Sequence, residues 1–143
     1  MEIGTRKISK EEVIQVLESE SILILATSAG DRVTVRPMSY INEGLDILFQ
    51  TDMNSLKMQQ IRDNPNVALC IGTYQIEGTA AELGPPLAES NKSFANAYKE
   101  KHPSSYEKYS AYEEEVVIIV TVHTVRQWRY ESGQPRMAEM FFA

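Results

Sequence analysis

The sequence has few of the side chains that build disulfides and metal sites. Among its 143 residues there is one cysteine, Cys70, and there are two histidines, His102 and His123. A single cysteine cannot form an intrachain disulfide, and these three residues lie too far apart in the sequence for a common metal-ligand spacing. We therefore expect no disulfide and no metal centre.

Runs of positive charge and long apolar segments are also missing. The 14 Lys and Arg residues are scattered, and they are outnumbered by 20 Asp and Glu residues, which leaves a net charge of −6. Such an acidic chain is a poor candidate for a nucleic-acid binder. No apolar run approaches the roughly 18 residues of a membrane span, and the N-terminal residues lack the apolar core of a signal peptide. We expect a cytoplasmic protein with neither a membrane nor a nucleic-acid partner.

The common catalytic motifs are absent as well. The sequence has no G-x-S-x-G elbow, no P-loop, no G-x-G-x-x-G turn and no Cys-His pair at a recognisable spacing. The acidic run at residues 113–115 is interpreted as the solvated start of a strand rather than as an acid/base pair. The catalytic residues are therefore unknown at this level.

What the sequence does contain is a succession of short strand-like segments. Runs rich in strand-forming residues, separated by turn residues, predict six strands, at residues 22–27, 32–41, 46–51, 67–74, 75–83 and 116–130. Short loops favour antiparallel neighbours, and a sheet of this size closes most easily into a small barrel. Residues 1–143 are predicted to form a single domain that is mainly β with flanking helices, an α+β protein built on a six-stranded antiparallel barrel.

Helices are predicted before and between these strands. Ser9 and Glu12 have the spacing of a capping box at the start of the first helix. The second helix, at residues 54–63, has Asp52 or Asn54 available as its cap. A third follows the Gly-Pro-Pro break near the middle of the chain.

The second predicted strand contains an unusual pair of residues. Its segment VTVRPMSYI, residues 33–41, places Arg36 and Pro37 in the middle of an otherwise good strand. Proline has no N–H to donate to a sheet ladder, so it belongs at an edge or a bulge. Main-chain groups near Pro37 would then remain free for a ligand.

The segment FQTDMNSLK, residues 49–57, joins a strand to a helix. The first turn of that helix would carry Ser55 and Lys57. Unpaired N–H groups and the positive end of the helix dipole favour anions at such a position. Because the two strands are hairpin neighbours, Arg36 could reach the same place. The sequence therefore predicts an anion site that suits a phosphate.

These elements together resemble the FMN-binding split β-barrel family, also called pyridoxamine 5′-phosphate oxidase-like, and its small general-stress-type flavoproteins look closest. The close match covers residues 22–73 and returns weakly at residues 116–130. The matching elements occur in the family's order: Ala26-Thr27, Arg36-Pro37, Thr51, Ser55-Leu56-Lys57 and Asn64-Pro65.

The resemblance implies that FMN is the cofactor and that the protein is a homodimer with FMN at the interface. The Arg36–Ser39 segment would face the flavin ring and ribityl chain, and Ser55 and Lys57 would hold the phosphate. Trp128 or Arg129 would come from the partner chain. The expected cofactor-binding residues are Arg36, Pro37, Met38, Ser39, Gln50, Thr51, Ser55, Lys57 and Trp128.

The implied function is that of an FMN-dependent oxidoreductase, with the flavin supplying hydride or electron transfer and a nicotinamide or other small molecule as electron donor. Two departures from the family bear on the substrate. Leu56 stands where many relatives have a basic residue, and the Arg-Leu-x-Pro-like ending of true pyridoxamine phosphate oxidases is missing, so that substrate is not predicted. The alternatives are a non-catalytic flavin binder such as a redox sensor, carrier or stress protein, the same barrel with deazaflavin or haem, and an interaction module whose FMN site has decayed.

Overall fold

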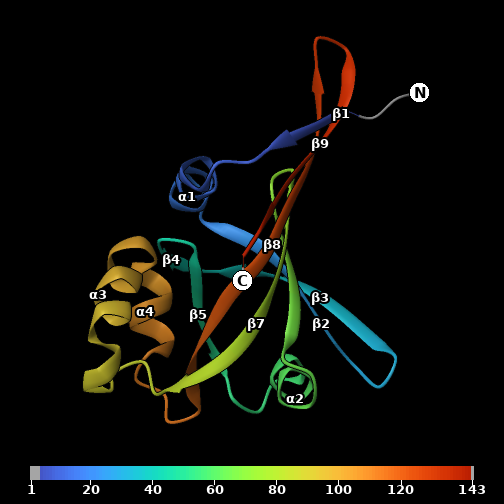
Figure 1. The fold of residues 1–143 in the computed structure, drawn as a ribbon. Coiled ribbons are helices and arrows are strands. Elements are labelled where there is room, and N and C mark those ends of the chain that lie inside the picture. The colour runs from blue at the N-terminus through green and yellow to red at the C-terminus, as the bar shows by residue number, and fades with distance from the viewer. Residues whose placement is uncertain (1–3, 143) are drawn as a thin grey trace.

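The structure, a computed structural model, describes residues 4–142 as one strongly bent sheet with helices packed around it (Figure 1). The strands are β1 (Gly4–Lys7), β2 (Ile22–Ala29), β3 (Arg32–Ser39), β4 (Ile41–Glu43), β5 (Asp46–Asp52), β6 (Asn66–Ile71), β7 (Tyr74–Gly84), β8 (Glu115–Glu131) and β9 (Gln134–Phe141). The helices are α1 (Lys10–Ser19), α2 (Leu56–Asp63), the 3-10 turn η1 (Glu89–Asn91), α3 (Lys92–Lys101) and α4 (Pro103–Tyr109).

The sheet is mainly antiparallel, which confirms the predicted fold class. Its hydrogen-bonded order is β1-β9-β8-β7-β6-β2-β3, and β5 joins through the first half of β8 with β4 at its other edge. The six predicted strands correspond to β2, β3, β5, β6, β7 and β8, and the structure adds β1, β4 and β9. The β1–β9 pair is parallel, unlike all the others.

The barrel is not closed. β3 and β4 follow one another directly in the chain, yet β3 pairs only with β2 among the strands that the structure describes, and β4 pairs only with β5. We call the gap between β3 and the β4–β5 hairpin the split. β3 is therefore an edge strand, the position that Pro37 requires because it cannot donate to a ladder.

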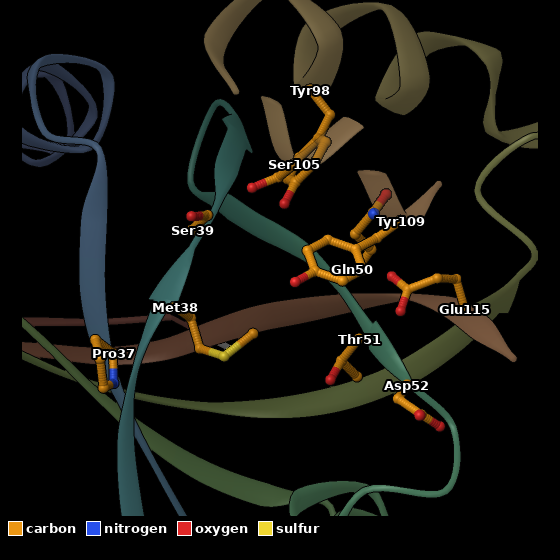
Figure 2. A pocket seen from close by; sticks show the side chains of 10 residues that line it. All are labelled: Pro37, Met38, Ser39, Gln50, Thr51, Asp52, Tyr98, Ser105, Tyr109 and Glu115. Atoms are coloured by element: carbon orange, nitrogen blue, oxygen red, sulfur yellow. The ribbon is translucent and has the colours of Figure 1, made fainter. Parts of the chain in front are cut away.

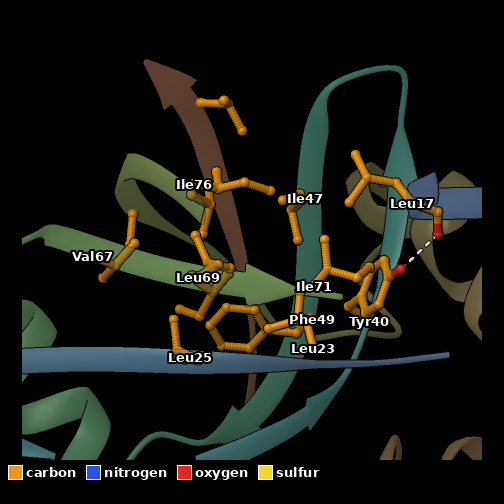
Figure 3. Packing of buried hydrophobic residues seen from close by; sticks show 14 of the residues in the cluster. Leu17, Leu23, Leu25, Tyr40, Ile47, Phe49, Val67, Leu69, Ile71 and Ile76 are labelled. Carbon is orange, nitrogen blue, oxygen red and sulfur yellow. Dashed lines mark hydrogen bonds between the residues drawn. The ribbon is translucent and has the colours of Figure 1, made fainter. Parts of the chain in front are cut away.

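The core lies inside the bend of the sheet (Figure 3). Alternate residues of β2 and β6, such as Leu23, Leu25 and Leu69, are buried there together with Phe49 of β5. Helix α1 covers one end, and the hydroxyl of buried Tyr40 donates a hydrogen bond of 2.6 Å to the Leu17 carbonyl. This packing holds β5 and the end of β3 rigidly on the two sides of the split.

The helix predictions are confirmed in part. Ser9 and Glu12 do form a capping box at the start of α1. The helical segment predicted after the Gly-Pro-Pro break consists of two helices, because α3 is followed at once by α4. Pro103 occupies the first turn of α4, where a missing N–H costs nothing. No helix within residues 4–142 combines the length and the apolar character that crossing a bilayer would take.

Candidate functional site

A cavity of about 290 Å³ opens in the split (Figure 2). One wall comes from the end of β3, another from the end of β5, and the remaining side from α3, α4 and the start of β8. The lining residues are Pro37, Met38, Ser39, Gln50, Thr51, Asp52, Tyr98, Ser105, Tyr109 and Glu115. The cavity thus lies where two strand edges face one another without a ladder between them.

The structure brings five of the nine predicted cofactor residues together in this cavity. Pro37, Met38 and Ser39 lie along the free edge of β3, which pairs on its other side with β2. Gln50 and Thr51 belong to the part of β5 beyond its short pairing with β4. Main-chain groups of both edges are therefore available to a flat, polar ligand.

Arg36 lies next to this group and is held by a network of polar side chains. Its guanidinium donates hydrogen bonds to the hydroxyls of Thr27 (2.8 Å) and Thr34 (2.5 Å). Both hydroxyls in turn donate to the Oε1 atom of Gln60, at 2.6 Å and 2.5 Å. Gln60 is 4% exposed and comes from α2, and its amide nitrogen donates to the Arg32 carbonyl. The network fixes the guanidinium against α2.

The N-terminus of α2 carries the other predicted phosphate residues. Ser55 is the N-cap, in place of Asp52 or Asn54, and its hydroxyl donates to the Asp52 carbonyl rather than capping the helix. Lys57 lies in the first turn. Burial lowers the pKa of Lys57 and the Arg36 charge lowers it further, while Glu115 and Asp52 act in the opposite direction. Lys57 and Arg36 are therefore two electrostatically coupled cations beside α2.

Trp128 does not line the cavity of its own chain. It lies in the outer half of β8, paired with Met137 of β9, and its ring contacts Tyr130 edge to face at 6.0 Å. Neighbouring Arg129 is held by Glu12 and by the Tyr74 hydroxyl. Whether either residue reaches a partner's site stays a prediction.

Sequence reasoning missed the wall of the cavity formed by helices. Tyr98 of α3 and Ser105 and Tyr109 of α4 line it from the side opposite β3. Tyr98 is buried and lies four residues after Phe94 on one face of α3, with ring centroids 5.2 Å apart. A spacing of four residues is typical of one face of a helix, and it does not indicate a binding site.

The interpretation of Glu115 as a solvated residue is wrong. Its side chain is 7% exposed, because β8 pairs with β5 and carries Glu115 into the cavity directly opposite Asp52. Burial raises the pKa of Glu115 and Asp52 raises it further, whereas Lys57 and the Gln50 amide lower it. Like charges in a directly opposed cross-strand pair destabilise a sheet. The arrangement therefore works against stability.

Gln50 is the second unusual buried group. It is 6% exposed, and its Oε1 accepts a hydrogen bond of 3.0 Å from the Ser110 hydroxyl. Its Nε2 has no hydrogen-bond partner of good geometry in the described part of the chain, although it lies close enough to the Glu115 carboxylate to lower the pKa of that group. Buried donors are nearly always paired, so an unpaired one that lines a cavity indicates a ligand acceptor atom.

The site can bind and orient a ligand, but it does not resemble a metal centre. Among residues 4–142 no three His, Cys, Asp or Glu side chains gather closely enough to hold a metal ion. His102 donates a hydrogen bond from Nε2 to the Tyr40 carbonyl, and His123 is exposed and bonded to Thr79. Cations from β3 and α2 beside two free strand edges suit an elongated polar ligand with one anionic terminus.

Known proteins share this fold. The model of the family described as pyridoxamine 5′-phosphate oxidase matches residues 9–129. General stress protein 26 of Bacillus subtilis is 33% identical over 69 residues, which are 48% of this chain and 49% of that protein. The solved structure of General Stress Protein 26 from Bacillus anthracis has a TM-score of 0.68 at 21% identity, over 81% of this chain and 90% of that one.

Other structures of the same fold differ in the ligand that their descriptions mention. One is a FAD-binding protein from Mesorhizobium loti, with 19% identity and a TM-score of 0.66, covering 84% of this chain and 94% of that one. Another is a heme storage protein from Vibrio cholerae, with 11% identity and a TM-score of 0.67, covering 82% and 92%. The fold alone does not select a cofactor. The match of the family model over most of the chain does decide the family: this protein belongs to the pyridoxamine 5′-phosphate oxidase-like family of split β-barrel proteins.

Proposed function

We propose that this protein is an FMN-dependent oxidoreductase with its flavin in the split. The observation that carries the proposal is the geometry at α2, where the Arg36 guanidinium is held by the threonine network and Lys57 lies in the first turn, beside a cavity that begins at Pro37. A phosphate at the cations would leave the rest of the cofactor lying along the free edges of β3 and β5. Bound there, a flavin supplies hydride or electron transfer, while the protein binds and orients it.

The phosphate end is supported by charge and by helix geometry. Neither Arg36 nor Lys57 forms an ion pair within the part of the chain that the structure describes. The threonine network fixes the Arg36 guanidinium. The first N–H groups of α2 receive no bond from the Ser55 hydroxyl, so they are available to an anion.

The ring end is supported by the unpaired Nε2 of Gln50. A flavin ring carries carbonyl and ring-nitrogen acceptors at its polar edge, and a buried amide donor without a partner needs an acceptor of this kind. Met38 and the free β3 edge offer an apolar and a polar surface for the ring. The expected haem alternative has less support, because neither histidine lines the cavity.

We further propose that two chains form a homodimer through the outer face of β2 and β3. Four large apolar residues are exposed there: Ile22 by 48%, Ile24 by 41%, Val33 by 71% and Val35 by 62%. Cys70 is exposed beside them and lines a hollow with Ala26 and Ala68. Contiguous apolar surface of this kind marks an interface, and a two-fold contact would bury the same face on both chains.

The flavin proposal is tested by comparing FMN with riboflavin, which lacks only the phosphate. Lys57→Ala should weaken FMN binding at least about tenfold, since a hydrogen bond to a charged group contributes about 1.5–3 kcal/mol, and should leave riboflavin nearly unchanged. Flavin fluorescence on titration measures both affinities. Lys10→Ala, at an exposed position on α1, is the matched control. Equal losses for both flavins would remove Lys57 from the phosphate site, and failure of the wild-type protein to bind either flavin would refute the proposal.

Reduction of the bound flavin distinguishes a catalytic protein from one that only binds the flavin. Anaerobic addition of NADH or NADPH to the FMN-loaded protein should bleach the flavin absorbance, followed by reoxidation with an electron acceptor. A protein that binds FMN but resists reduction by both donors would instead be a flavin carrier or sensor.

The dimer is tested by placing a charge on the proposed interface. Val35→Glu should convert a dimer to a monomer in size-exclusion chromatography with light scattering, because each interface would bury two unpaired carboxylates. Leu87→Glu, at a residue 51% exposed on another surface, is the matched control and should stay dimeric. A wild-type monomer would overturn the proposal.

A further inference from the structure

Ser110, which directly follows α4, is a buried polar residue in an otherwise exposed stretch. It is 4% exposed, whereas no residue of α4 is buried and residues 111–114 all lie at the surface. A serine side chain is small and polar, so it adds little to an apolar core. The burial of Ser110 is therefore explained by a polar interaction rather than by packing.

The hydroxyl of Ser110 makes that interaction with Gln50 of β5. It donates a hydrogen bond of 3.0 Å to the Gln50 Oε1 atom, across 60 residues of sequence. A serine hydroxyl commonly bonds instead to a main-chain group in its own turn. At the end of α4 the main-chain N–H of Ser110 donates to the Tyr106 carbonyl at 3.1 Å, and the hydroxyl is left for Gln50. The hydroxyl therefore serves the site and not the helix.

This bond fixes which end of the Gln50 amide is left for a ligand. The amide has an acceptor, Oε1, and a donor, Nε2, and the two ends have nearly the same shape. Ser110 occupies Oε1, while Nε2 has no partner of good geometry in the described part of the chain. Glu115 favours the same orientation: burial raises the pKa of its carboxyl, and the Gln50 amide partly offsets that rise, as a donor does. Two neighbours thus hold the amide with its donor end free.

We propose that Ser110 is a positioning residue for the flavin: it holds the Gln50 amide so that Nε2 donates to an acceptor at the polar edge of the ring, and it thereby raises the reduction potential of the bound flavin. Ser110 can act in this way only if the ring lies beside Gln50, so this inference rests on the proposed function. Reduction adds electron density to the carbonyl and nitrogen acceptors of a flavin, so a fixed donor stabilises the reduced form more than the oxidised form. Because Ser110 ends α4, the helical wall of the cavity and the electronics of the cofactor are then coupled.

The midpoint potential of bound FMN, measured against reference redox dyes, tests this role in Ser110→Ala. Without the hydroxyl, Oε1 loses its partner and the amide is free to turn. Reduced FMN should lose about threefold to tenfold more affinity than oxidised FMN, which lowers the two-electron potential by about 14–30 mV. FMN and riboflavin should weaken by the same factor, in contrast to Lys57→Ala, because the change is at the ring. Ser104→Ala, the same change at an exposed position of α4, is the matched control and should alter neither quantity.

Two further variants separate positioning from a general structural role. Gln50→Met removes the donor itself and should lower the potential at least as far as Ser110→Ala does. In the Gln50→Met background, Ser110→Ala should have no further effect on the potential, because the group that Ser110 positions is gone. Ser110→Thr keeps the hydroxyl and should keep the wild-type potential.

An unchanged potential in Ser110→Ala would overturn the inference, and so would an equal fall in potential with and without the Gln50 amide. Ser110 would then have a structural role only, which thermal unfolding measures independently. Failure of the wild-type protein to bind FMN, measured separately by fluorescence, would instead refute the proposed function.

Discussion

Two groups of opposite charge border the split. What we call the cationic end consists of Arg36 on β3 and Lys57 in the first turn of α2, and the acidic end consists of Glu115 on β8 and Asp52 on β5, which lie opposite one another in the sheet. The cationic end is supported by hydrogen bonds through Thr27, Thr34 and Gln60. The acidic end is less well satisfied, because it combines opposed carboxylates with an unpaired amide.

This difference shows how the site divides its tasks. A pre-organised cation needs little rearrangement when a phosphate arrives, so the network around Arg36 suits permanent retention of a cofactor. The buried Glu115 carboxylate and the unpaired Gln50 donor are costly in the empty protein, and a ligand can relieve that cost. The acidic end is therefore suited to a group that enters and leaves.

The largest expected effect is at the cationic end. Arg36→Met should weaken FMN binding roughly tenfold to a hundredfold, because it removes a fixed charged donor worth about 1.5–3 kcal/mol. Riboflavin should be much less affected. Titrations followed by flavin fluorescence give the ratio of the two losses. A loss shared equally by both flavins would place Arg36 at the ring and not at the phosphate.

A smaller effect is expected at Gln60, which holds Arg36 through two threonines and does not itself bind the phosphate. Gln60→Leu removes the acceptor shared by Thr27 and Thr34, so the Arg36 guanidinium should lose its fixed position. We expect about a tenfold weakening of FMN with little change for riboflavin, and a loss of unfolding free energy of about 1–3 kcal/mol from the disrupted buried hydrogen bonds. Thermal unfolding and the two flavin titrations separate these effects. Reduced stability with an unchanged FMN-to-riboflavin ratio would make Gln60 purely structural.

The smallest expected effect is at the acidic end, and it is a gain in stability rather than a loss. Burial and Asp52 raise the pKa of Glu115, so the folded protein binds a proton there more tightly than the unfolded chain does. Stability associated with Glu115 is then complete at pH below the unfolded pKa and falls as the pH rises through the folded pKa. Glu115→Gln should therefore raise the melting temperature of the ligand-free protein at neutral pH by about 2–4 °C, and the gain should vanish near pH 4. A lower melting temperature at neutral pH would show that Glu115 stabilises the empty site.

Much of the fold followed from local chemistry in the sequence. The missing N–H of Pro37 restricts its strand to an edge, and β3 is indeed the edge beside the split. Short turns likewise predicted the antiparallel neighbours. Such features depend on a residue and its nearest neighbours, so the sequence alone determines them.

Only the tertiary structure brings the residues of the acidic end together. Glu115 lies in a run of three glutamates that looks solvated, and only the pairing of β8 with β5 buries it opposite Asp52. Tyr109 reaches the cavity because α4 packs across the split rather than continuing α3. These contacts join segments about sixty residues apart, and local spacing carries no information about such pairing. The sequence by itself determined an edge strand and a helix start suited to phosphate, whereas the long-range register of the sheet decided what faces them, because register sets which side chains enter the core.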